Sequence, residues 1–219
     1  MKKTILALAL IASTSAFADV KAGKFGMGFS YAGSWAAFTT TKNTGSSSGI
    51  SQGMPTANAQ YHITDMIAVA ANVGFFTTNY RDKSSLDAQG FNGQIKEYSA
   101  TAWSAGLEIP LYLAKFNLLN FYVAPGFSYT PYKVTTTTTN VSATGVQTTP
   151  ANSPSTSTSN YLSIYGVIGL QVAINDQLHA FGRTTIGYAS GTYNSGLQES
   201  TDSYFGLQSW AVGALFYFN

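Results

Sequence analysis

The chain has 219 residues, of which only 9% are charged and 45% are hydrophobic, and it contains no cysteine. Ordinary soluble domains carry about 25% charged residues, so this composition argues against a soluble domain. The absence of cysteine excludes disulfides and a lipidated cysteine anchor. Lys2 and Lys3 account for the whole formal net charge of +2, so the rest of the chain is neutral and no nucleic-acid partner is indicated.

The N-terminus has the pattern of a secretory signal. Lys2 and Lys3 precede the apolar run Thr4–Ile11, and Ala16-Phe17-Ala18 places small residues at the cleavage positions before Asp19. The apolar run is shorter than the roughly 20 residues of a membrane-spanning helix, and no later segment reaches that length. We therefore predict a signal peptide over 1–18 and a single domain over 19–219.

Strict alternation of large and small side chains marks the first predicted strand, Lys24 to Phe38. Phe25, Met27 and Phe29 alternate with glycine and serine, which is typical of a strand with one face on lipid and the other on a lumen. Seven further segments alternate in this way: Met54–His62, Met66–Thr78, Tyr98–Leu111, Leu119–Tyr132, Tyr161–Ile174, Gln177–Ala189 and Ser203–Phe218. In the last of these, Leu207 and Leu215 are predicted on the inward face and interrupt the pattern.

The predicted connections alternate in length. Short turns are expected at 63–65, 112–118 and 175–176, and long loops at 39–53, 79–97, 133–160 and 190–202. Short turns face the periplasm in transmembrane barrels, which puts both chain ends there. The predicted fold is an all-β, eight-stranded antiparallel transmembrane up-and-down β-barrel. Aromatic girdles at the two membrane interfaces are expected from Phe25, Trp35, Tyr61, Trp103, Phe121, Tyr129, Tyr188, Trp210, Phe216 and Phe218.

Two short motifs resemble those of known barrels. Gly213, Phe216 and Phe218 resemble the C-terminal assembly signal of outer-membrane barrels, offset by the extra residue Asn219. Ile63-Thr64-Asp65 resembles a turn common in that group. The chain therefore resembles the small eight-stranded outer-membrane proteins of the OmpA transmembrane-domain, OmpX and OmpW kind. This resemblance implies an outer-membrane location and insertion by the barrel-assembly machinery.

Two charges, Glu108 and Arg183, are predicted to face the lumen. An eight-stranded lumen is only wide enough for packed side chains or one small ligand, and an unpaired buried charge is very costly. We therefore expect the two side chains to form a pair, as a structural plug or as the gate of a narrow pore. Polar side chains expected to accompany them are Asn58, Gln60, His62, Asn72, Gln171 and His179.

The sequence gives little support for an enzyme. The two histidines lie at the predicted periplasmic strand ends, no catalytic triad is evident, and no spacing fits a metal site, so no catalytic residue, metal or cofactor is predicted. A soluble lipocalin-like barrel would place large apolar residues inside, the opposite of the predicted faces.

The predicted loops carry the remaining functional hypotheses. Within 135–159, 15 of 25 residues are Ser or Thr, a composition expected to stay mobile or weakly extended. The segment 79–97 carries charges of both signs, which suits lipopolysaccharide headgroups or solubility. The predicted function is a non-enzymatic structural or surface-interaction barrel, in contact with outer-membrane lipid and lipopolysaccharide and with a possible extracellular ligand at its loops. The alternative is a narrow pore or conduit for small or hydrophobic solutes.

Overall fold

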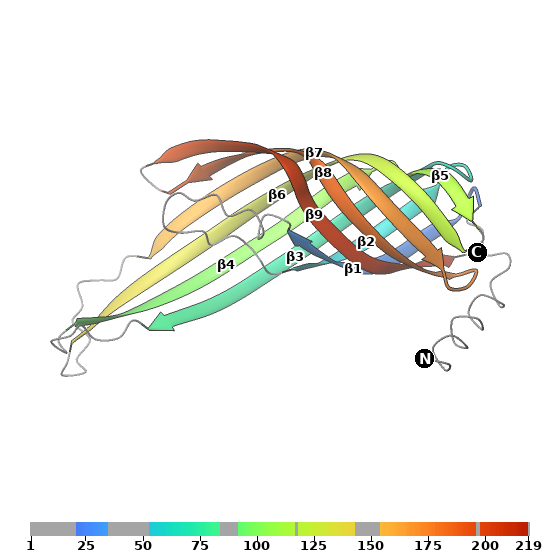
Figure 1. Cartoon of the computed structure of the whole chain (residues 1–219). Coiled ribbons are helices and arrows are strands. Elements are labelled where there is room, and N and C mark those ends of the chain that lie inside the picture. The colour runs from blue at the N-terminus through green and yellow to red at the C-terminus, as the bar shows by residue number, and fades with distance from the viewer. Residues whose placement is uncertain are drawn as a thin grey trace, which may run out of the picture.

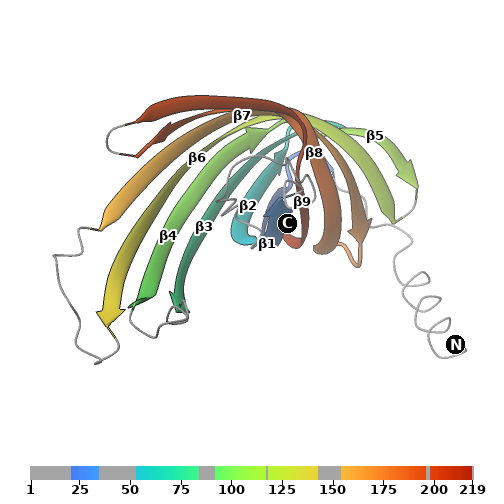
Figure 2. The same cartoon turned by 60° about the vertical axis from the view of Figure 1, so that its left-hand side comes forward.

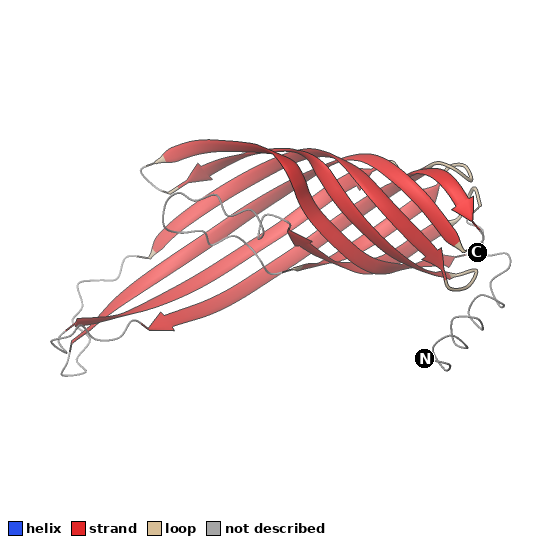
Figure 3. Cartoon of the chain, in the orientation of Figure 1, coloured by secondary structure: helices blue, strands red, loops and turns tan. Residues whose placement is uncertain are grey.

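The computed structural model describes residues 21–34, 53–83, 92–116, 118–142, 154–195 and 198–218. This part of the chain contains strands and turns, drawn in red and tan in Figure 3. No helix among these residues is long and apolar enough to cross a membrane. The strands are β1 (Phe25–Ser34), β2 (Met54–His62), β3 (Ala68–Lys83), β4 (Asn92–Glu108), β5 (Leu111–Phe116), β6 (Leu119–Ser142), β7 (Ser155–Ala173), β8 (Leu178–Asn194) and β9 (Glu199–Phe218).

The strands form one closed antiparallel barrel (Figure 1). Consecutive strands pair with each other, except that β4 and β5 both pair with β6, and β1 pairs with β9 from Phe25↔Phe218 to Ser34↔Ser209. β4 and β5 act as a single barrel strand, because their register against β6 continues unchanged from Glu108↔Gly126 to Leu111↔Val123. The prediction of an eight-stranded antiparallel barrel is therefore confirmed.

The predicted turn over 112–118 is wrong in its first part, since β5 continues the strand to Phe116. Pro110 has no backbone N–H, so it interrupts the ladder for two residues without ending the strand. Its carbonyl still accepts from the Ala68 N–H at 2.9 Å. Proline reads as a strand end in the sequence, but here it only divides one barrel strand into two segments.

Three predicted long loops are also wrong, because most of their residues belong to strands. β3 and β4 pair as far as Lys83↔Ile95, β6 runs to Ser142, and β8 and β9 pair as far as Asn194↔Glu199. The threonine run 135–139 of β6 pairs with β4 along its whole length, and Thr135 and Thr136 also pair with β7. β-branched threonine favours extended backbone, and the ladder with β4 pairs backbone groups of the run without a hydrophobic core.

β3, β4 and β6 project furthest at the end opposite the short turns, as the two views of Figures 1 and 2 agree. We call the paired part of these strands and of β7 beyond the level of Phe75, Trp103, Tyr129 and Leu162 the extension. The short turns predicted at 63–65 and 175–176 are present in the structure. Thr64 Oγ1 accepts from the N–H groups of Met66 and Ile67, and Asn175 Oδ1 accepts from those of Gln177 and Leu178.

The two faces of the barrel wall follow the predicted alternation, with one exception. Phe29, Val73 and Ile164 are 77%, 57% and 64% exposed on the outer face, while inward neighbours are buried. Leu207, predicted to face inward, instead points outward and is 54% exposed.

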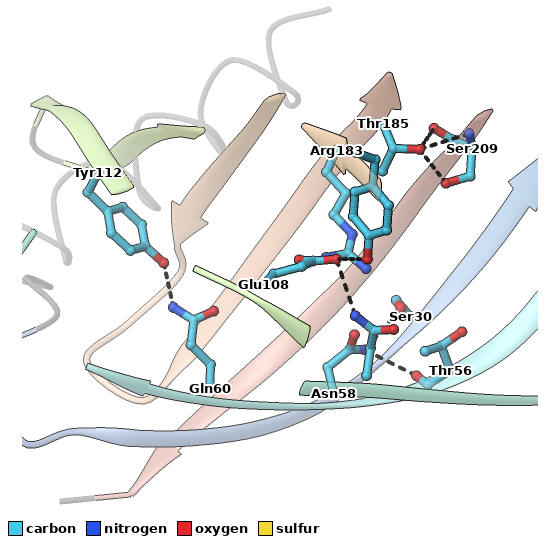
Figure 4. A network of polar contacts seen from close by, with 11 residues as sticks. Ser30, Thr56, Asn58, Gln60, Glu108, Tyr112, Arg183, Thr185 and Ser209 are labelled. Atoms are coloured by element: carbon cyan, nitrogen blue, oxygen red, sulfur yellow. Dashed lines mark hydrogen bonds and ion pairs between the residues drawn. The ribbon is translucent and has the colours of Figure 1, made fainter. Parts of the chain in front are cut away.

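A bulge opposite Thr185 and Ile186 explains this correction. Gln208 is the extra residue of β9, because Thr185 pairs with Ser209 and Ile186 pairs with Leu207. The extra residue exchanges the inward and outward positions of β9 on its two sides. Thr185 Oγ1 accepts from the Ser209 N–H at 3.0 Å and bonds the Ser209 hydroxyl at 2.8 Å (Figure 4). Leu215, beyond the bulge, faces inward as predicted and is 4% exposed.

A charge placed on the outer apolar face tests which part of the wall meets lipid. We expect Val73→Arg, near the middle of the apolar face of β3, to lower the free energy of unfolding by about 2–4 kcal/mol in phosphatidylcholine vesicles, because the cation enters hydrocarbon. Asn79→Arg, on the same strand and face but beyond the apolar band, should cost at most about 1 kcal/mol. Urea unfolding followed by tryptophan fluorescence measures both, and equal costs would contradict a lipid boundary between them.

Candidate functional site

Polar side chains cross the lumen in two layers near the short-turn end of the barrel. The first, the charged layer, consists of Asn72, Glu108, Tyr122, Tyr165 and Arg183. The second, the histidine layer, consists of Gln60, His62, Tyr112, Gln171, His179 and Tyr217. Most of these side chains are buried, and Figure 4 shows the contacts of Glu108 with Arg183 and of Gln60 with Tyr112.

Glu108 on β4 is the centre of the charged layer. Arg183 Nη1 on β8 donates to Glu108 Oε2, forming an ion pair across the lumen. Glu108 Oε1 accepts from the Tyr165 hydroxyl at 3.1 Å and from Asn72 Nδ2 at 3.2 Å. The Glu108 side chain is 2% exposed. Its buried charge is balanced by one cation and two neutral donors, each from a different strand.

Arg183 is held by contacts beyond the carboxylate. Its side chain is 13% exposed, and its guanidinium carbon lies 5.8 Å from the ring centroid of Phe181, within the range of a cation–π contact. A Cβ at Gly169 would lie 2.2 Å from the Tyr122 ring. The missing side chain at this position lets Tyr122 lie flat against the wall beside the ion pair.

The histidine layer is a continuous hydrogen-bonded chain. Gln60 Nε2 donates to the Tyr112 hydroxyl at 2.6 Å, and that hydroxyl donates to Gln171 Oε1 at 2.7 Å. Gln171 Nε2 lies 2.7 Å from His179 Nδ1 and donates to the Tyr217 hydroxyl at 3.1 Å. The chain thus joins β2, β5, β7, β8 and β9 across the barrel.

Aromatic contacts close the same layer. The His62 ring lies 5.2 Å from Tyr112 and 5.7 Å from Tyr217, and His179 meets Tyr217 edge-on at 4.8 Å. Tyr217 and His62 are 0% and 1% exposed. Between the two layers lies a cavity of about 20 Å³, lined by residues of both, including Gln60, Glu108 and Arg183. A volume of this size holds about one water molecule.

The structure brings together most of the lumen residues that the sequence singles out. Glu108 and Arg183 are in contact, Asn72 joins them, and Gln60, His62, Gln171 and His179 share the second layer. Asn58 lies apart from both hydrogen-bonded networks, where its Nδ2 donates to Ser30 Oγ at 2.9 Å (Figure 4).

Four tyrosines central to the layers were not singled out by the sequence. Tyr112 falls within the predicted turn over 112–118, and Tyr122, Tyr165 and Tyr217 are not among the predicted lumen residues. Tyr217 could have been placed in the lumen from the sequence, because it lies an even number of residues from Leu215, which is predicted to face inward.

Predicted girdle residues lie on the outer face. Phe25, Tyr61, Trp103, Phe121, Tyr129, Tyr188, Phe216 and Phe218 are 40–49% exposed there. Trp35 and the predicted signal peptide fall outside the described residues. Of the predicted assembly signal, Phe216 and Phe218 point outward and Gly213 faces Ser30 of β1; its role in assembly stays a prediction.

A closed antiparallel barrel with an apolar outer band and a polar lumen defines this chain as a small eight-stranded outer-membrane β-barrel. No family model and no curated protein matches the sequence.

Several solved barrels are similar in structure. A major outer membrane protein from Thermus thermophilus is 14% identical, with a TM-score of 0.49 and coverage of 90% of this chain and 100% of that one. OprG from Pseudomonas aeruginosa is 13% identical, with a TM-score of 0.46 and coverage of 93% and 99%. The Escherichia coli outer membrane protease OmpT is 7% identical, with a TM-score of 0.40 and coverage of 90% and 94%. Similarities this low indicate no function, so the absence of enzymatic activity stays a prediction.

A double-mutant cycle measures the coupling between the two lumen charges. Glu108→Gln and Arg183→Met should each destabilise the barrel by about 3–5 kcal/mol, because each leaves the opposite charge buried and unpaired. The double variant should be less destabilised than the sum of the two. Urea unfolding in vesicles gives the energies, and strictly additive losses would show that the pair is not coupled.

Proposed function

We propose that the chain is a non-enzymatic outer-membrane barrel that does not conduct and that presents its extension at the cell surface. The observation that carries this proposal is the filling of the lumen by the charged layer and the histidine layer. The cavity between them holds about one water molecule. A hydrated solute would have to break the Glu108–Arg183 pair and the Gln60–Tyr112–Gln171 chain to pass.

The extension supports a role in surface interaction. β4 and β6 are paired on both sides along most of their length, so their polar side chains are presented by an extended sheet and not by a loop. The lumen-side face of this sheet carries tyrosines. Tyr80 and Tyr98 face each other across β3 and β4 with ring centroids 6.3 Å apart.

Further tyrosines continue this face around the rim of the barrel. By the alternation of their strands, Tyr132 on β6, Tyr161 on β7 and Tyr204 on β9 all lie on the lumen-side face of the wall. Tyrosine offers a large amphipathic contact area with few rotatable bonds, which favours binding surfaces. The rim therefore has the chemistry of a platform for an extracellular ligand.

A narrow pore is the second candidate, and one observation favours it. Beyond the charged layer, the lumen wall carries short hydroxyl side chains, including Ser30, Thr56 and Ser104, which leave room for water. In this alternative the two layers would act as a gate.

Single-channel recording in planar bilayers separates the two candidates. We expect the refolded protein to be electrically silent, because the filled lumen has no continuous water path. Glu108→Gln and Arg183→Gln are recorded in parallel, and heat-modifiable gel migration confirms that each sample is folded.

Steady unitary currents in the unsubstituted protein, changed in size or duration by either substitution, would overturn the proposal in favour of a pore gated by the pair. Silence of the unsubstituted protein, together with currents in the variants only, would support a plug that keeps the lumen closed.

A further inference from the structure

The apolar outer band of the barrel ends at three aromatic residues on adjacent strands. Phe75 on β3 pairs with Trp103 on β4, and the Trp103 ring meets Tyr129 of β6 edge-on at 5.7 Å. All three are 40–56% exposed on the outer face. Amphipathic rings favour the boundary between hydrocarbon and headgroups, so lipid acyl chains end at this level.

Beyond the row of Phe75, Trp103 and Pro131, the outer face is polar among the described side chains of β3 and β6 and as far as Glu97 on β4. The register aligns these side chains in three rows across the strands, from Thr77↔Thr101↔Lys133 to Arg81↔Glu97↔Thr137. We call the nine residues the headgroup patch: Thr77, Asn79, Arg81, Glu97, Ser99, Thr101, Lys133, Thr135 and Thr137.

The headgroup patch is hollowed and carries charge. A depression of about 310 Å³ is lined by eight residues, six of which belong to the patch. Arg81 Nε lies 3.3 Å from Glu97 Oε1, and both side chains are 56% exposed. Exposed Lys133 in the row nearest the membrane adds a cation to the patch.

The geometry determines what lies beside the headgroup patch. It continues the lipid-facing surface outward, so its neighbours are the headgroups of the lipids whose chains cover Phe75 and Trp103. From Phe75 to Arg81 the strand rises about 20 Å, at roughly 3.3 Å per residue, which a strand tilt of about 40° reduces to a height of roughly 15 Å. The polar zone of a phospholipid leaflet is only about 5–8 Å thick.

We propose that the headgroup patch binds the phosphorylated sugar headgroup of lipopolysaccharide. This inference rests on the proposed placement of the extension at the cell surface. Lys133 pairs with the phosphate nearest the acyl chains, through a charge-assisted hydrogen bond. Asn79, Ser99 and the threonine hydroxyls bind sugar hydroxyl groups in the depression, where a taller saccharide headgroup covers the height that a phospholipid leaves bare.

Titration with fluorescent lipopolysaccharide tests this proposal on the full refolded protein in detergent micelles. Lys133→Glu should weaken binding about tenfold or more, since it replaces a charge-assisted bond with repulsion. The matched control is Lys96→Glu, on the same sheet but on the lumen-side face. It should change the affinity less than twofold, and heat-modifiable migration shows whether both variants fold.

The source of the anionic group is separated by two further probes. Enzymatically dephosphorylated lipopolysaccharide should bind the unsubstituted protein and Lys133→Glu with nearly equal affinity. Phosphatidylglycerol should bind more weakly than lipopolysaccharide and should not respond to Asn79→Ala. Equal losses for Lys133→Glu and Lys96→Glu, or phosphatidylglycerol binding as tight as that of lipopolysaccharide, would overturn the proposal.

A cysteine probe distinguishes failure of this inference from failure of the proposed function. The chain has no native cysteine, so Thr138→Cys, on the lumen-side face of β6 opposite Lys96, introduces a single label site in the extension that lies outside the headgroup patch. Labelling by an impermeant maleimide on intact cells supports the placement of the extension at the surface. If the site is protected on intact cells and reacts only after lysis, both proposals fail. If it reacts but lipopolysaccharide does not bind, only this inference fails.

Discussion

Hydrogen bonding of the backbone in a medium without water is the constraint on which the rest of this structure depends. In hydrocarbon, each unsatisfied N–H or C=O group costs several kcal/mol, so strands can cross only if the sheet closes on itself. Here the pairing of β1 with β9 closes the ring along ten residue pairs, and the register of β4 and β5 against β6 continues across Pro110. Closure then requires alternation, because each strand has lipid on one side and the lumen on the other.

The narrow lumen follows from closure with eight strands, and it turns polar side chains into crosslinks. Charges that face the lumen have little water to solvate them, so they must find partners on other strands. Glu108 and Arg183 do so with Tyr165 and Asn72, and Gln60, Tyr112 and Gln171 do so without charge. The same side chains that stabilise the wall also fill the space that a pore would need.

The outer face changes its chemistry when it leaves the lipid, while the backbone pattern does not change. β3, β4 and β6 continue as paired strands past Phe75 and Trp103, although their outward side chains become threonine, asparagine and charged residues. This continuity explains why loops were predicted where strands occur. Hydrophobic alternation reports burial in lipid and ends at the membrane boundary, whereas backbone pairing depends on neighbouring strands.

The sequence by itself determined the closed barrel, the face of nearly every strand and the identity of the two lumen charges, because alternation with a period of two is a local property imposed by lipid. Only the tertiary structure decided where strands end, which face Leu207 occupies and which residues meet across the lumen. The bulge at Gln208 and the continuation past Pro110 depend on pairing with β8 and β6. The tyrosines of the two layers become partners only when five or more strands close around them, and no spacing within the chain encodes that contact.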